Sequence, residues 1–190
     1  MYSKRVDTLN RAFSKISRAN FVPDDLTNIA NLDISLPIGF GQTISQPSTV
    51  KMMLEWLEVE PGNKILDIGS GSGWTTALLA NLTGQKGRVY AVERIPELLE
   101  FGQDNCLRLG IKNVKFFKAS KTYGLPKFAP YDRILVSADA HVLPPELVDQ
   151  LKTDGKMVIP IKYDILEIAK NHDNSLEIMA HPGFIFVPLV

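Results

Sequence analysis

The chain has 190 residues, which is enough for one domain with a full hydrophobic core and too few for two comfortable ones. Its 21 basic and 21 acidic residues cancel, so no overall electric field favours nucleic acid or an anionic membrane as a partner. Cys106 is the sole cysteine, which excludes an internal disulfide and a cysteine-based metal site, and no apolar run has the length of a membrane span. We expect no bound metal. We also expect a cytoplasmic protein, since no secretory signal pattern opens the chain.

The N-terminal region reads as a helix followed by a long loop. Apolar residues at helical spacing predict an amphipathic helix over 3–17. The basic residues that accompany this helix are interpreted as a solvated face rather than a contact to nucleic acid: Lys4, Arg5, Arg11, Lys15 and Arg18. Residues 21–46 are expected to be mostly irregular, and a loop of that length in a compact domain is commonly functional.

A second helix begins at Pro47, which suits the first turn of a helix, and Glu60-Pro-Gly ends it. The apolar run 64–68 then predicts a strand buried on both faces of a parallel sheet. Glycines at positions 69, 71 and 73 follow, and a helix starts at Trp74. A strand, a glycine turn and a helix N-terminus leave free backbone N–H groups where a ligand can approach closely.

The spacing of these glycines discriminates between ligands. A dinucleotide fingerprint would require glycine where Trp74 stands, and no Walker-type phosphate loop occurs. With Asp67 ahead of the glycines, the loop resembles motif I of class I methyltransferases, whose cofactor is S-adenosylmethionine. That resemblance places Asp67 near the cationic methionine end and makes Glu93, at the end of the strand 88–93, the acid for the ribose hydroxyls. The alternative is a glycine-rich turn without a ligand.

Strands and helices then alternate. We predict a helix over 96–109, strands over 113–117 and 131–137, a short helix over 144–151, a strand over 156–161, and closing strands near 164–169, 175–179 and 184–189. Such alternation indicates an α/β fold with a doubly wound, mostly parallel sheet and antiparallel C-terminal strands. The resemblance to class I methyltransferases implies that this is their Rossmann-like fold. We expect one domain over 1–190, with N-terminal helices and a substrate loop in 1–60 and a cofactor-binding core in 61–190.

One run is more specific than the glycine loop. Leu36-Pro-Ile-Gly-Phe-Gly-Gln-Thr-Ile-Ser-Gln-Pro47, followed by an apolar helix, resembles the segment that precedes motif I in protein-L-isoaspartate O-methyltransferases. The resemblance extends to Asn20-Phe-Val-Pro-Asp-Asp, to Ala129-Pro-Tyr-Asp-Arg-Ile-Leu-Val-Ser, to the run from Leu143 to Pro160, and to the closing Phe184-Ile-Phe-Val-Pro-Leu, so it covers nearly the whole chain.

The resemblance implies a protein-repair enzyme that methylates the free α-carboxylate of L-isoaspartyl residues in damaged proteins and peptides. Such a carboxylate, with a pKa of about 4, is already ionised at neutral pH, so the reaction needs no general base. Alignment of the nucleophile, the methyl group and the leaving sulfur can supply much of the acceleration. No catalytic histidine is therefore required, and we expect His141, His172 and His181 to lie exposed in turns.

The site residues follow from the matched motifs. By position, Ser45 is the family's active-site serine; the alternative is an N-cap for the helix at Pro47. The resemblance implies Gln42 and Ile44 as substrate-binding residues. It implies the following as cofactor-binding residues: Thr43, Ser45, Asp67, Gly69, Ser70, Gly71, Gly73, Glu93, Ala119 and Ser120. The partner implied is the isoaspartyl substrate; we expect a monomer, with no nucleic acid and no membrane bound.

Three positions depart from the family pattern. Ala119-Ser120-Lys121 replaces Gly-Asp-Gly, whose aspartate meets the adenine amine, and Ser137-Ala138-Asp139-Ala140 replaces Thr-Ala-Ala-Ala, which would bring a carboxylate to the edge of the cofactor pocket. Asn31-Leu32-Asp33 lacks the usual aromatic residue. Two alternatives stay open: a methyltransferase for another peptide carboxylate, and a catalytically weak cofactor-binding relative. A nucleic-acid methyltransferase is disfavoured, because Leu143-Pro-Pro-Glu is not an Asn-Pro-Pro-aromatic motif.

Overall fold

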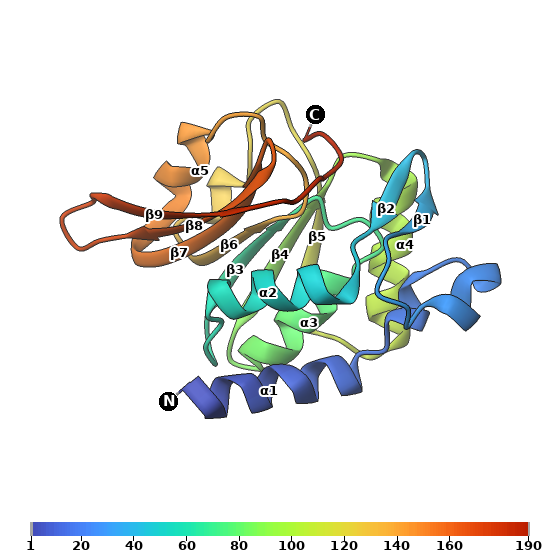
Figure 1. Ribbon diagram of the computed structural model, residues 1–190. Helices are drawn as coiled ribbons and strands as arrows, with labels where there is room; N and C mark the ends of the chain where they lie inside the picture. Colours follow the sequence, from blue (N-terminus) through green and yellow to red (C-terminus); the bar gives the residue numbers. More distant parts are fainter. Residues whose placement is uncertain (1, 190) are drawn as a thin grey trace.

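The computed structural model describes residues 2–189, and the side chains of residues 5–189. A large mixed sheet forms the centre, and helices cover it (Figure 1). The helices are α1 Tyr2–Lys15, α2 Pro47–Leu57, α3 Trp74–Thr83, α4 Pro96–Arg108 and α5 Pro145–Gln150, with 3-10 turns η1 Arg18–Phe21, η2 Asp24–Ile29 and η3 Pro126–Phe128. The strands are β1 Leu36–Gly39, β2 Gln42–Ile44, β3 Lys64–Ile68, β4 Arg88–Glu93, β5 Val114–Lys118, β6 Tyr131–Val136, β7 Leu151–Ile161, β8 Asp164–Lys170 and β9 Leu176–Pro182.

The large sheet has the strand order β5-β4-β3-β6-β7-β8-β9. Strands β3 to β7 run parallel to one another, whereas β8 and β9 are antiparallel additions at one edge. This confirms the predicted fold class. The strand order reverses at β3, whose neighbours β4 and β6 both run parallel to it. In open α/β sheets such a reversal leaves a crevice at the carboxyl ends of the strands, where ligands bind.

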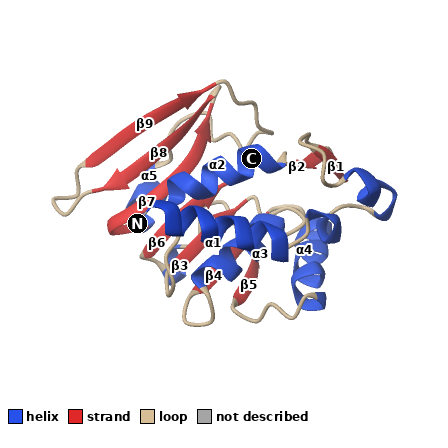
Figure 2. Cartoon of the chain, turned by 60° about the horizontal axis from the view of Figure 1, so that its bottom comes forward, coloured by secondary structure: helices blue, strands red, loops and turns tan. Residues whose placement is uncertain are grey.

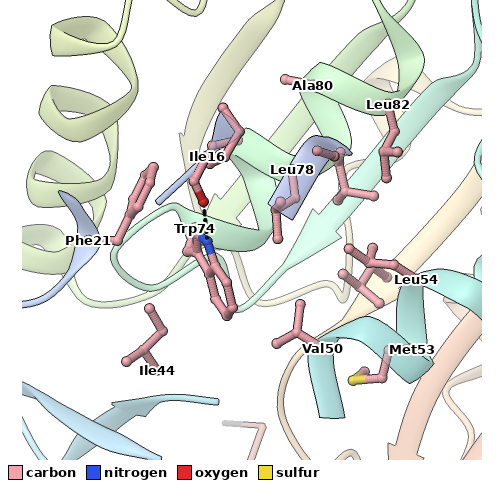
Figure 3. Close-up of a cluster of buried hydrophobic side chains, with 14 of the residues drawn as sticks. Ile16, Phe21, Ile44, Val50, Met53, Leu54, Trp74, Leu78, Ala80 and Leu82 are labelled. Carbon is pink, nitrogen blue, oxygen red and sulfur yellow. Dashed lines mark hydrogen bonds between the residues drawn. The ribbon is translucent and has the colours of Figure 1, made fainter. Parts of the chain in front are cut away.

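The two faces of the sheet bury different clusters, because successive side chains of a strand point to opposite faces. Ile65 packs with α1, α2, α3 and α4, whereas Leu66 packs on the face that α5 and η3 cover. Figure 2 shows α1, α2 and α3 side by side on one face. In the first cluster the indole of Trp74 lies among apolar side chains and donates its Nε1–H to the carbonyl of Ile16 at 3.2 Å (Figure 3).

The segment 30–46, here called the hairpin segment, contains more structure than the sequence suggested. Residues 21–46 were expected to be mostly irregular, and that expectation is wrong for this part, because β1 and β2 pair as an antiparallel hairpin. Leu36 and Ile38 are buried in β1, so the pair has an apolar side. Three consecutive residues with positive φ reverse the chain at its tip, Gly39, Phe40 and Gly41. The hairpin lies outside the large sheet (Figure 1).

The predicted strand over 184–189 is wrong. Strand β9 ends at Pro182, and Gly183 takes a φ of 97°, which turns the chain away from the sheet edge. Beyond it, the chain makes a single parallel bridge, between Pro188 and Asp139. Residues 183–189, here called the C-terminal segment, therefore return as an extended stretch toward the carboxyl ends of the central strands (Figure 1).

One of the three histidines is not exposed. His181 lies in β9, which continues past the predicted end of that strand, and its ring stacks on Trp56 at a centroid distance of 3.8 Å. His172 lies in the exposed β8–β9 turn, and His141 is exposed. Within residues 2–189 no helix is long and apolar enough to cross a membrane. The same residues hold no cluster of three or more histidine, cysteine or acidic side chains placed to bind a metal ion.

Candidate functional site

A cavity of about 300 Å³ opens at the carboxyl ends of β3, β4 and β6, where the strand order reverses. Its wall is drawn from the glycine loop, the end of β4, the loop after β5, the hairpin segment and the C-terminal segment. Seven of the predicted site residues line it: Gln42, Thr43, Gly69, Gly71, Glu93, Ala119 and Ser120. The fold therefore gathers residues from both predicted halves of the site around one space.

The glycine loop shapes the floor of this cavity. Gly69 and Gly71 have φ values of 73° and 50°, in the left-handed region that favours glycine. A Cβ on Gly71 would lie 3.1 Å from Cδ1 of Ile38, so a larger residue there would press against the hairpin. Gly73 does not line the cavity. A Cβ there would lie 2.9 Å from the carbonyl oxygen of Gly102, so this glycine lets α3 and α4 meet.

Glu93 ends β4 with its carboxylate at the edge of the cavity. The side chain is buried, and backbone N–H groups hold both of its oxygens. Oε2 accepts from the N–H of Gly71 at 2.9 Å, and Oε1 accepts from Arg94 at 2.7 Å and from Ile95 at 3.0 Å. These bonds fix a negative charge beside the glycine loop, which gives the cavity an acceptor for hydroxyl groups.

Asp67 lies beneath the loop and does not line the cavity. Its carboxyl group is fully buried, and its Oδ2 accepts hydroxyl hydrogen bonds from Thr75 at 3.2 Å and from Thr76 at 2.5 Å. Its Oδ1 has no hydrogen-bond partner among the described residues. Burial raises the pKa of Asp67 to about 6. Sequence reasoning missed both threonines; hydroxyls in the first turn of a helix after an acid-bearing strand would have been the signal.

A smaller cavity of about 40 Å³ adjoins the first and is rich in hydroxyl groups. Three further predicted residues line it, Ile44, Ser45 and Ser70. Other hydroxyls around it come from Ser72, Thr75 and Ser137, and Gly69 and Gly71 belong to both cavities. The hydroxyl of Ser70 is buried without a partner among the described residues. A buried polar atom of this kind is normally satisfied by a ligand or a water.

Ser45 is not the N-cap of α2, so the alternative reading of this serine is wrong. The cap position belongs to Gln46, and the N–H of Ser48 in the first turn is instead bonded by Oδ1 of Asp33 at 2.8 Å. That bond is the main reason that the pKa of Asp33 is lowered. The hydroxyl of Ser45 makes no hydrogen bond to any described residue, which leaves it available at the wall of the smaller cavity.

Arg18 is buried, which corrects the interpretation of this residue as part of a solvated basic face; the side chain of Lys4 lies outside the described residues. The guanidinium of Arg18 donates to four backbone carbonyls of the hairpin segment: those of Ala30 at 2.8 Å, Leu32 at 3.4 Å, Ile34 at 2.8 Å and Ile44 at 3.1 Å. Burial lowers its pKa to about 10. Arg18 follows the predicted helix, so its sequence position gave no sign of this role.

Asp139 does not reach the cavity, which corrects the expectation of a carboxylate at the pocket edge. Its Oδ1 accepts from the N–H groups of His141 at 2.8 Å and Lys162 at 2.7 Å. Ser137 and Ala138 line the cavity in its place. The other lining residues that the sequence did not reveal come mainly from the loop after β5 and the C-terminal segment, among them Tyr123, Val187, Pro188 and Leu189.

Comparisons with a family sequence model and with known proteins match nearly the whole chain to the same family. Residues 3–190 match the sequence model of the family described as Protein-L-isoaspartate(D-aspartate) O-methyltransferase (PCMT). The chain is similar to a protein-L-isoaspartate O-methyltransferase of Pyrococcus horikoshii, with 44% identity over 97% of this chain and 85% of the relative.

Solved structures agree with the sequence relatives. A protein-L-isoaspartate O-methyltransferase superposes with a TM-score of 0.86 and 29% identity, over 100% of this chain and 66% of the other. A second similar structure, with a TM-score of 0.85 and 27% identity, covers 97% of this chain and 90% of the other. It is a putative protein-L-isoaspartate O-methyltransferase from Plasmodium falciparum, in complex with S-adenosyl-L-homocysteine.

Proposed function

The chain belongs to the protein-L-isoaspartate(D-aspartate) O-methyltransferase family, and on that premise we propose that it methylates L-isoaspartyl residues of damaged proteins and peptides with S-adenosylmethionine. The observation that carries this proposal is the shared cavity. Gln42 and Thr43, from the run most specific to the family, line the same space as Gly69, Gly71 and Glu93. A cofactor-binding module without an acceptor site would not need that convergence.

The residues present fit the cofactor. The buried Oδ1 of Asp67 and the buried hydroxyl of Ser70 both lack hydrogen-bond partners among the described residues. We assign the amino-acid end of the cofactor to Ser70, which lines the smaller cavity, with the carboxyl group of Asp67 acting from beneath the loop. Glu93 would accept from the ribose hydroxyls, and Ala119 with Ser120 would face the adenine ring. When bound, S-adenosylmethionine supplies a methyl group activated by its sulfonium sulfur. Thr43, Gly69 and Gly71 complete the proposed set at the cavity wall, where the two glycines let a ligand approach the backbone closely, and Gly73 supports this loop by letting α3 and α4 meet.

The chain's own contribution to the reaction is alignment rather than proton transfer. A carboxylate acceptor, with an ordinary pKa of about 4, is the nucleophile without deprotonation by the protein. We assign Ser45 as the catalytic residue that donates its free hydroxyl to this carboxylate, and Gln42 and Ile44 as the residues that hold the peptide. Holding the reacting groups in line lowers the barrier by reducing the entropy lost at the transition state.

The remaining assignments are proposals of the same kind. We propose that residues 1–60 form the substrate side of a single domain and that residues 61–190 form its cofactor-binding core. The core supports this, since Leu9, Leu54 and Ile65 belong to one buried cluster. We further propose that the protein acts as a cytoplasmic monomer on protein and peptide substrates, without nucleic-acid or membrane partners.

Transfer of labelled methyl from S-adenosylmethionine to an isoaspartyl peptide tests the proposal, with the aspartyl peptide of the same sequence as its control. We expect transfer to the isoaspartyl peptide alone. Equal transfer to both peptides would indicate a methyltransferase for another carboxylate. A melting experiment separates loss of activity from loss of binding: S-adenosylhomocysteine at a hundred times its Kd should stabilise the fold by about 2.7 kcal/mol, whereas NAD should not. Stabilisation without transfer would indicate a catalytically silent relative.

A further inference from the structure

Asp139 joins three segments that are distant in the sequence. Through its carboxylate it holds its own loop, by the N–H of His141, and the turn between β7 and β8, by the N–H of Lys162. Both of these residues have positive φ values, 60° and 59°, a conformation that L side chains rarely adopt. One carboxylate oxygen therefore stabilises two unfavourable turns at once.

The backbone of Asp139 holds the third segment. Its N–H donates to the carbonyl of Val187 at 2.8 Å, and its carbonyl accepts from the N–H of Leu189 at 2.7 Å. The turn that Lys162 belongs to also reaches this segment, because the carbonyl of Tyr163 accepts from Gly183 and Phe184 at 2.9 and 3.0 Å. Both ends of the C-terminal segment are thus tied to elements that the Asp139 carboxylate fixes.

The C-terminal segment matters because its last residues form a wall of the cavity. Val187, Pro188 and Leu189 line it, together with Ala138, the residue before Asp139. No regular sheet pairing holds these residues, since the segment makes one isolated bridge. The position of this wall therefore depends on the geometry of residue 139, where the chain departs from the family pattern of alanine.

We infer that Asp139 is a positioning residue for cofactor binding: it clasps the C-terminal segment in place so that Val187, Pro188 and Leu189 close the cavity. This inference rests on the proposed function, since it takes the cavity as the cofactor site. It explains an acidic residue that the family pattern lacks without placing a second carboxylate beside the ligand. The chemistry is that of two backbone amides bonded to one charged oxygen, which is stronger than a bond between neutral groups.

Calorimetric binding of S-adenosylhomocysteine to Asp139→Ala, Asp139→Asn and Asp173→Ala tests the clasp. Asp139→Ala removes the acceptor for both amides, and we expect its Kd to rise about tenfold, the lower end of what a hydrogen bond to a charged group contributes. Asp139→Asn keeps an acceptor oxygen and should stay within about threefold of the parent chain.

Asp173 is a matched control. Its carboxylate also accepts from a backbone N–H and a hydroxyl within a turn, both of Ser175, but it lies in the β8–β9 turn away from the cavity. Asp173→Ala should lower the melting temperature at most slightly and leave the Kd unchanged. Equal Kd values for Asp139→Ala and the parent chain would overturn the inference, as would an equal loss in Asp173→Ala.

Hydrogen exchange on the unmodified protein covers the case in which Asp139→Ala does not fold. S-Adenosylhomocysteine should slow exchange in residues 183–189 together with the glycine loop at residues 69–73. Protection of the glycine loop alone would overturn the clasp while leaving the cofactor site intact. Absence of protection in both regions would instead count against the proposed function.

Discussion

The glycine loop and the hairpin segment face each other across the same cavity, but they are held in place by different means. The loop stands between two consecutive elements, β3 and α3, and its conformation follows from glycine at positions 69 and 71. The hairpin segment lies outside the large sheet. The buried guanidinium of Arg18 holds it through hydrogen bonds to backbone carbonyls of the segment. A local pattern therefore builds the cofactor side, whereas long-range polar contacts build the acceptor side. We expect the acceptor side to be the easier of the two to break selectively.

The largest expected effect tests that asymmetry directly. Arg18→Met keeps an apolar stem and removes the donor of four carbonyls, two of them in fully buried hydrogen bonds. It should therefore destabilise the fold by about 3 kcal/mol, since each buried acceptor left unpaired costs about 1–3 kcal/mol. Methyl transfer to isoaspartyl peptide should fall about a hundredfold, which corresponds to roughly 2.7 kcal/mol at the transition state. Urea unfolding and initial rates measure the two quantities.

Cofactor affinity distinguishes this from a general loss of structure. S-Adenosylhomocysteine affinity should fall less than turnover in the folded fraction of Arg18→Met, because only Thr43 and Ser45 of the proposed cofactor residues belong to the hairpin segment, and the glycine loop and Glu93 make no hydrogen bond to Arg18. Arg11→Met is the matched control, since Arg11 is an exposed arginine of α1 whose guanidinium donates to the hydroxyl of Thr8 and to no other described residue. If affinity and turnover fell together in Arg18→Met, the two sides of the cavity would not be independent.

The same contrast explains what the sequence could predict. The strands β3 and β4 begin and end where their patterns place them, and α2 begins at the predicted Pro47 but ends at Leu57, ahead of Glu60-Pro-Gly. Apolar runs, glycines and proline act on adjacent residues, so their effects can be predicted locally. Gly69, Gly71, Glu93, Ala119 and Ser120 line the larger cavity for the same reason, since they end or follow strands, whereas Gln42 and Thr43 were predicted from the family resemblance. The buried Arg18, the cap that Asp33 gives to α2, and the clasp of Asp139 were missed. Each joins residues that neither spacing nor composition brings together, so only the tertiary structure reveals them.

The next largest effect is a pH dependence of folding stability, which arises from Asp67 beneath the glycine loop. Burial raises the pKa of Asp67 from 3.8 to about 6, so the folded chain favours the protonated acid. Its contribution to stability is fully present below pH 3.8 and is lost as the pH rises through 6, a change of about 3 kcal/mol. Asp67→Asn cannot ionise, so it should gain stability relative to the parent chain between pH 4 and pH 7. Urea unfolding of both chains across that range measures the difference.

Binding of a cofactor with a cationic end should favour the ionised form of Asp67 over the protonated one. If Asp67 interacts with that end, binding of S-adenosylmethionine at pH 6 should release about half a proton per parent chain, because the pKa of Asp67 is about 6, and none from Asp67→Asn. Calorimetry in buffers of different ionisation enthalpy detects the proton. A stability difference between the chains that stays constant with pH would show that Asp67 titrates normally in the folded state.

Ser45→Ala should affect turnover more than stability. The hydroxyl is free of other described partners, and the loss of one hydrogen bond to a charged carboxylate costs roughly 1.5–3 kcal/mol, about ten- to a hundredfold in rate. Ser48→Ala is the paired control, because the hydroxyl of Ser48 bonds Gln46 within the first turn of α2. It should lower the melting temperature and leave kcat unchanged. The opposite pattern would restore a structural role for Ser45 and remove it from the acceptor side.

The smallest expected effect is a change in cofactor affinity at Ser120, and it tests which residues belong to the cofactor side of the cavity. Ser120 lines the cavity, and its hydroxyl is bonded within its own loop, to the backbone of Thr122 at 3.1 and 3.3 Å. Ser120→Asp would offer the adenine amine a charged acceptor, which exceeds a neutral one by about 1 kcal/mol, a few-fold in affinity. Because the carboxylate of Asp139 is turned to the amides of His141 and Lys162, no second acid competes for that place.

Calorimetry should therefore show tighter binding of S-adenosylhomocysteine to Ser120→Asp, and the same gain in the Ser120→Asp, Asp139→Asn double variant. An analogue whose adenine amine carries two methyl groups is the control, since it has no N–H to donate and should gain nothing from the new carboxylate. A gain that persists with this analogue would mean that Ser120 does not face the amine. Weaker binding that Asp139→Asn relieves would mean that the two carboxylates meet in the cavity after all.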